Sequence, residues 1–176
     1  MRFENTSIKD AALIAVCAAI LFVQQLALSF LPNIQFTTLL IILFTKVLGF
    51  KRTTFIIIIH VMVINILSPY GPLMPIYIPS MFIGWMLIPI SLTTIFKKLN
   101  SAYPLAIFGF VFGFVYGWLY IPIAVLVLGI PFEAYFMMDL PFELIMALSN
   151  FLTVLWLYEP LRKMLQKEKE KYYQIV

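Results

Sequence analysis

The sequence predicts an all-α integral membrane protein with six transmembrane helices in three hairpins and both termini in the cytoplasm. The first observation behind this prediction is composition, because 63% of the 176 residues are hydrophobic and only 11% are charged. Soluble globular domains are about half apolar and about a quarter charged. A chain of this size could not hide so much apolar surface from water. The composition therefore argues against a soluble enzyme, a disordered protein and a nucleic-acid-binding protein.

The second observation is the spacing of the charged residues. Each of three long segments lacks any Asp, Glu, Lys or Arg, and each is too long for one crossing, which takes about 20 residues. Turn-forming residues interrupt the segments, so each is expected to fold as a helical hairpin. The uncharged segments run between Asp10 and Lys46, between Arg52 and Lys97, and between Lys98 and Glu133. The turn signals are Pro32-Asn33, Ser68-Pro69-Tyr70-Gly71-Pro72 and Gly129-Ile130-Pro131.

These segments give six expected helices within a single transmembrane domain that covers residues 1–176. The second and third helices are short for a bilayer, so we expect them to tilt little or to end in thinned, partly wet surroundings. A basic cytoplasmic tail is expected at 161–176. The expected helices lie at roughly 10–31, 33–48, 53–67, 73–96, 103–128 and 139–160.

The third observation is that all the basic residues fall on one side of the predicted topology. The positive-inside rule then places both termini in the cytoplasm. The loops on the other side contain no Lys or Arg, and the last of them holds Glu133 and Asp139, with Glu143 just inside the next helix. The basic tail from Arg162 to Lys171 is expected to be a solvated helix end rather than a lipid-specific site.

The chain shows no pattern typical of an enzyme or of a cofactor site. It has one histidine, one cysteine, no phosphate-binding loop and no cluster of metal-ligating residues. We therefore expect no catalytic residue, no metal and no cofactor, and any ATP-driven step would need another chain. His60 lies in a run of isoleucines, where a buried, hydrogen-bonded residue and a ligand contact are both open interpretations.

The first expected helix carries Ala11, Ala15 and Ala19 at four-residue spacing. Small residues in register allow another helix backbone to approach closely in lipid. Two interpretations follow. The stripe either packs against other helices of this chain or forms a docking face for a separate subunit.

Polar side chains within apolar helices are costly and often functional. Asn65 lies near the outer end of the third helix, and Glu143 and Asn150 lie on the same face of the last helix because they are two turns apart. Glu143 could bind a ligand or stabilise the dipole at the start of that helix. Tyr77 lies near the outer interface, where aromatic residues often anchor a protein, whereas Trp85 lies deeper.

These features together resemble a known family. The six helices with cytoplasmic termini, the alanine stripe and the short second helix resemble the substrate-binding S component of energy-coupling factor (ECF) transporters. The residues that precede the second helix are Pro32-Asn33-Ile34-Gln35. The stretch from Asn65 to Trp85 is similar to the third-loop region of such proteins through Gly71-Pro72, Pro75, Pro79 and Gly84-Trp85.

The resemblance implies a function and its partners. S components bind a vitamin or related micronutrient at the outer face of the prokaryotic plasma membrane, and they pair with a transmembrane coupling subunit and two cytoplasmic ATPases. By this resemblance, Ala11, Ala15 and Ala19 would meet the coupling subunit. The binding cavity, built from outer loops and outer helix halves, would include Asn65, Tyr77, Trp85, Tyr120, Glu143 and Asn150.

The charged residues on the outer side restrict the class of ligand that we expect. No Lys or Arg on the outer side could pair with an anion, and burying an anion near Glu133, Asp139 or Glu143 would be unfavourable. We expect a neutral or cationic ligand with a ring that stacks on Trp or Tyr, such as a pyridoxine-like, hydroxymethylpyrimidine, thiamin-like or flavin-like compound.

Three other functions are compatible with a small helical membrane protein. A stand-alone secondary transporter is the main alternative, with His60 and Glu143 as the only plausible relay groups within the membrane. A membrane scaffold protein would also use a small-residue face. A membrane-embedded enzyme is less favoured, because no nucleophile–base pair or metal cluster is visible.

Overall fold

The computed structural model describes residues 2–68, 71 and 73–174, with side chains from residue 8 onward. The expected turn residues Pro69, Tyr70 and Pro72, and the side chain of Arg2, lie outside this description. Every regular element in the described part is a helix. The elements are α1 (Arg2–Ala27), α2 (Thr37–Leu48), α3 (Phe50–Ile66), the 3₁₀ turn η1 (Pro75–Tyr77), α4 (Ile78–Thr93), α5 (Ala102–Trp118), α6 (Ile121–Leu126) and α7 (Phe132–Gln174).

The helices have the length and surface of a membrane protein. Large apolar side chains such as Phe30, Leu126 and Met137 are exposed, as lipid-facing residues are. Four described segments are long and apolar enough to cross a membrane, and the short apolar helix α2 is not among them. Six crossings therefore stay a prediction. The four segments are Ile8–Ala27, Pro75–Thr93, Ala102–Leu126 and Phe132–Gln174.

The ends of the first and last helices differ from those expected. α1 begins at Arg2 instead of near residue 10, and α7 covers Phe132–Gln174 instead of about 139–160. We placed the expected ends near charged residues, but Lys and Glu are good helix formers and do not stop a helix at a membrane surface. The basic residues from Arg162 to Lys171 consequently form the last part of α7, which is the helix end that we expected.

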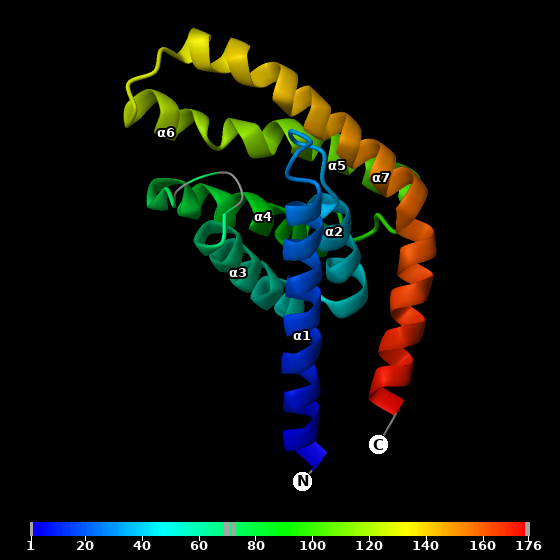
Figure 1. Cartoon of the computed structure of the whole chain (residues 1–176). Coiled ribbons are helices and arrows are strands. Elements are labelled where there is room, and N and C mark those ends of the chain that lie inside the picture. Colours follow the sequence, from blue (N-terminus) through cyan, green and yellow to red (C-terminus); the bar gives the residue numbers. More distant parts are fainter. Residues whose placement is uncertain (1, 69–70, 72, 175–176) are drawn as a thin grey trace.

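The expected fifth helix is divided into α5 and α6. α5 ends at Trp118, and Pro122 lies in the first turn of α6, where its missing N–H and fixed φ favour a new helix start. Two further prolines, Pro141 and Pro160, lie inside α7. Figure 1 shows that α7 bends in its orange part. A proline inside a helix removes a backbone donor and is a common cause of such a bend.

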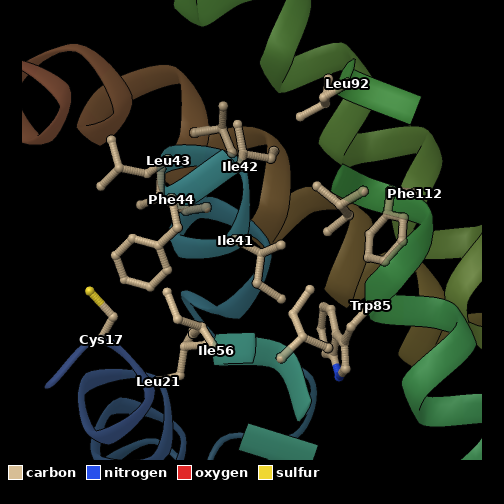
Figure 2. Close-up of a cluster of buried hydrophobic side chains, with 14 of the residues drawn as sticks. Cys17, Leu21, Ile41, Ile42, Leu43, Phe44, Ile56, Trp85, Leu92 and Phe112 are labelled. Carbon is tan, nitrogen blue, oxygen red and sulfur yellow. The ribbon is translucent and has the colours of Figure 1, made fainter. Parts of the chain in front are cut away.

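α2 lies at the centre of the molecule. Ten of its twelve residues are buried, and it packs against α1, α3, α4 and α7. A helix surrounded by protein need not match the thickness of the bilayer, which accounts for the shortness of α2. Figure 2 shows side chains from α1, α3, α4 and α5 around it, among them Cys17, Leu21, Ile56, Trp85 and Phe112.

α5 and α7 pack closely through small residues. A Cβ atom placed on Gly113 would lie 2.7 Å from both the Cα and the N of Ala147, so only glycine fits between the two backbones. One turn earlier, a Cβ atom on Gly109 would lie at an ordinary 3.5 Å from the Cβ of Asn150. Such close contacts replace the hydrophobic effect as the source of helix association in lipid.

Ionic and polar contacts join the two ends of the chain. Arg52 of α3 donates to Asp10 of α1 at 3.0 and 3.1 Å, and the hydroxyl of Tyr173 of α7 also donates to Asp10. Lys169 donates to the carbonyl of Val47 at 2.8 Å. Figure 1 shows the two termini at the same end of the molecule. We call the side that holds these basic residues the basic side; its cytoplasmic placement stays a prediction.

Replacement of Gly113 by Ala should destabilise the fold by about 1–3 kcal/mol, because the added methyl group meets the backbone of Ala147. Gly109→Ala is the matched control, and it should be neutral or slightly stabilising because its methyl group has room and Ala favours a helix. Reversible SDS unfolding in mixed micelles measures both. Equal stability of the two variants would contradict the close α5–α7 approach.

Candidate functional site

A cavity of about 300 Å³ lies on the side opposite the basic residues, where α1, α3, η1, α4, the α5–α6 junction and α7 come together. We call it the tyrosine cavity, after the three tyrosines in its wall. None of the described residues in its lining carries a charge, and two of them bear amide groups. The lining residues are Gln25, Ile64, Asn65, Ser68, Leu73, Met74, Tyr77, Met81, Tyr120 and Tyr135.

Stacked aromatic rings connect this cavity to the core. The ring centroids of Tyr77 and Tyr120 lie 5.6 Å apart, and the hydroxyl of Tyr120 donates to that of Tyr116 at 2.9 Å. The ring of Tyr116 in turn packs on Trp85 with centroids 4.5 Å apart. Gly84 makes room for this arrangement, since a Cβ atom there would lie 2.7 Å from Cδ2 of Tyr116. The rings offer flat faces on which a ligand ring could stack.

A second cavity of about 430 Å³ adjoins the tyrosine cavity and shares Gln25 with it. We call it the loop cavity, because residues 29–35, between α1 and α2, form much of its wall. Its floor contains Trp85 and Tyr116, and Phe142 of α7 closes one side. The side-chain oxygen Oε1 of Gln25 is buried and accepts no hydrogen bond within the described part of the chain. This oxygen could accept a hydrogen bond from a ligand.

Gln24 holds the loop to the start of α2. Its Oε1 accepts from the backbone N–H of Phe36 at 2.9 Å, while its Nε2 donates to Oγ1 of Thr37 at 2.7 Å and to the carbonyl of Leu21 at 2.9 Å. These bonds satisfy a backbone donor that the first turn of a helix leaves without an internal partner. Gln24 is thus a structural residue.

Asn33 attaches the same loop to α7. It adopts a left-handed backbone conformation with φ of 57°, which Asn tolerates better than most residues. Its Nδ2 donates to the carbonyl of Phe142 at 2.9 Å. The loop between α1 and α2 is therefore fixed at both its α2 end and its α7 side.

The structure brings together part of the predicted site. Asn65, Tyr77 and Tyr120 line the tyrosine cavity, and Trp85 lies at the floor of the loop cavity with only 2% of its surface exposed. Asn65 uses its Nδ2 to donate to the carbonyl of Val61 at 2.8 Å. These residues come from α3, η1, α4 and the α5–α6 junction.

Glu143 and Asn150 line neither cavity and are buried between α7 and α5. Oε2 of Glu143 accepts from the indole N–H of Trp118 at 3.1 Å, and Nδ2 of Asn150 donates to the carbonyl of Gly109 at 3.1 Å. Their shared face is thus confirmed. The helix-dipole interpretation of Glu143 is wrong, because α7 begins at Phe132, several turns earlier.

The three stripe alanines, Ala11, Ala15 and Ala19, are exposed on α1, whereas Cys17 and Ala18 point into the core. Packing of the stripe against this chain's own helices is therefore not observed. The helix presents a face of small side chains to whatever surrounds the protein.

His60 is fully buried on α3, but neither ring nitrogen has a partner within the described residues. The expectation of a buried residue is confirmed, and that of a hydrogen-bonded one is not. Its ring lies edge-on to Trp85 with centroids 6.5 Å apart. No hydrogen bond joins His60 to Glu143 in the part of the chain that the structure describes.

Gln25 and Tyr135 are among the cavity residues that were not predicted as site residues. Gln25 had a signal, because an amide in the outer half of an apolar helix is costly unless it is used. Tyr135 was expected near the outer interface, in the loop before the last helix, and instead lies in the first turns of α7.

Comparison with known proteins adds no relative: no protein-family model, no curated protein and no solved structure matches the chain.

Substitutions of the neighbouring residues Gln24 and Gln25 should distinguish a residue that stabilises the fold from one that belongs to the candidate site. Gln24→Leu should destabilise the protein by about 2–3 kcal/mol, because it leaves the N–H of Phe36 without a partner and removes two further hydrogen bonds. Gln25→Leu should change stability by less than about 1 kcal/mol, because its buried oxygen accepts no hydrogen bond. Reversible SDS unfolding compares the two, and the opposite ranking would refute these roles.

Proposed function

We propose that the chain is the substrate-binding S component of an ECF-type importer, which captures a vitamin-like ligand at the outer face for ATP-driven uptake. The tyrosine cavity carries this proposal. It lies opposite the basic side, has no charged residue in the part of its wall that the structure describes, and gathers three of the residues that the family resemblance implied, Asn65, Tyr77 and Tyr120.

The orientation of the cavity follows from the charge distribution. With the basic side facing the cytoplasm, as the positive-inside rule favours, both cavities open toward the outside of a prokaryotic plasma membrane. The four long apolar segments, joined by α2 and α3, would then make up the six crossings.

The cavity walls favour an uncharged or cationic ring compound. Aromatic faces from Tyr77, Tyr120 and Tyr135 would stack on a ring, and the amides of Gln25 and Asn65 would bind its polar edge. A carboxylate or phosphate would find no Lys or Arg there. Thiamin-like, hydroxymethylpyrimidine, pyridoxine-like and flavin-like compounds fit this chemistry better than folate or pantothenate.

The exposed alanine stripe supports a partner in the membrane. Ala11, Ala15 and Ala19 would let a helix of the coupling subunit approach the backbone of α1 closely. Because the chain has no phosphate-binding loop, the two ATPases of such an importer would be separate cytoplasmic proteins.

The direct test is a ligand screen on the purified chain in mild detergent. Thiamin, pyridoxine and riboflavin represent the expected class, and folate and pantothenate the excluded one. At least one of the first three should bind, and Gln25→Leu should weaken that binding by about tenfold through loss of one buried hydrogen bond. Gln24→Leu with excess ligand serves as the stability control. Binding of only folate or pantothenate would refute the ligand class.

Partner binding is tested by purification of the tagged chain from its native membrane. Wild-type chain should recover a coupling subunit and two ATPases, and Ala15→Leu should lose them while it keeps ligand binding, because its side chain blocks close approach. Ala134→Leu, at an exposed alanine of α7, is the matched control and should keep the partners. Recovery of the chain alone would favour a stand-alone transporter or a scaffold.

A further inference from the structure

An apolar groove of about 460 Å³ lies between α4 and α5, away from both cavities. Its walls come from Leu87 on α4 and from Ile107, Val111 and Val115 on α5, and Ser91 is the one polar residue in its lining. Phe96 and Leu99, from the segment that joins the two helices, close its end. The proposed ligand-binding and partner-binding surfaces do not use this groove.

The groove opens toward the surroundings of the protein. Ile107, Val111 and Val115 are spaced by four residues on one face of α5, and the opposite face packs on α7 through Gly109 and Gly113. Val111 is 54% exposed and Ile107 is 44% exposed, so the wall is accessible from outside. In a membrane these surroundings are lipid acyl chains.

Basic residues lie at the closed end of the groove. Lys97 and Lys98 fall between the lining residues Phe96 and Leu99, both are exposed, and neither forms an ion pair within the described part of the chain. Nζ of Lys46 reaches the same segment and donates to the carbonyl of Lys97 at 3.3 Å.

Arg162 of α7 reaches this segment as well and donates to the carbonyl of Asn100 at 3.1 Å. It also pairs with Glu159 at 2.9 Å, which balances its charge. The lysines at the groove end therefore leave a net positive charge there.

We propose that the groove binds one acyl chain of an anionic membrane phospholipid, whose phosphate group lies over Lys97 and Lys98. The apolar walls match the acyl chain, and the lysines lie on the basic side, where headgroups of the inner leaflet would be. Basic pockets between transmembrane helices on the cytoplasmic side suit anionic headgroups. This inference does not depend on the proposed transport function.

Charge favours a lipid over a second copy of the chain as the occupant. Two copies with the same orientation in a membrane would place their lysine pairs at the same depth, where the positive charges repel. An anionic lipid instead neutralises them. Each lysine should then contribute about fivefold to the preference for an anionic over a neutral headgroup.

The test uses native mass spectrometry of the full chain, with phosphatidylglycerol and phosphatidylcholine of identical acyl chains as probes. The wild-type chain should retain one phosphatidylglycerol molecule in preference to phosphatidylcholine. Lys97→Gln combined with Lys98→Gln should reduce this preference by about 25-fold. Lys167→Gln combined with Lys171→Gln removes two exposed lysines of α7 elsewhere and should leave the preference unchanged.

A second variant tests the groove itself. Val111→Trp should reduce retention of both lipids, because the indole fills the space of the acyl chain. If the Val111→Trp variant does not fold, Ile107→Phe is used in its place. Equal retention of the two lipids by the wild type, an unchanged preference after the Lys97/Lys98 change, or full retention in the groove-filled variant would each overturn the proposal. A lipid-independent dimer that the groove-filling variant abolishes would overturn it too.

Discussion

The close approach of α5 to α7 is the contact on which the other surfaces depend. Gly113 lets the α7 backbone at Ala147 come so near that the two helices form one arm of the molecule. This arm carries Tyr120 and Tyr135 to the tyrosine cavity, and it turns the opposite face of α5 toward α4, where the apolar groove lies. Because lipid is as apolar as the side chains it meets, such close backbone packing and a few buried hydrogen bonds supply much of the specificity of the arrangement.

Buried polar groups in this protein divide into those with partners and those without. Gln24 uses both ends of its amide to tie elements together, whereas Asn150 donates to Gly109 but leaves its buried Oδ1 without a partner in the described structure. Gln25 and His60 keep buried atoms without partners in the described structure. In a medium without water an unpartnered polar atom is costly, so each such position is a candidate for a role other than stability. Gln25 lies where the two cavities meet, so this energetic cost falls at the candidate binding site.

Part of this structure could be predicted from the sequence. The lengths of the apolar segments predict the helices, and the spacing of the charged residues predicts a common basic side, because helices and charge placement depend on local composition. The gathering of Asn65, Tyr77 and Tyr120 followed from their positions near the same ends of neighbouring helices. The neighbours of Glu143 and Asn150 could not be predicted, because helical periodicity assigns a shared face but not the helix that covers it. The length of α7 and the burial of α2 were missed because charge and length were taken as markers of membrane boundaries, whereas both depend on tertiary packing.

The length of α7 links the two sides of the molecule mechanically. A helix of 43 residues is about 65 Å long, roughly twice the hydrocarbon thickness of a bilayer. One end places Tyr135 in the wall of the tyrosine cavity, and the other places Tyr173 against Asp10 of α1. Between these two ends α7 is one continuous helix, in which the backbone N–H groups are missing only at Pro141 and Pro160. Because Tyr172 and Tyr173 bond to Lys9 and Asp10 of α1, a tilt of the cavity end of α7 would reach α1 through these two neighbouring tyrosines, with the two proline positions as the weakest points of the helix between them.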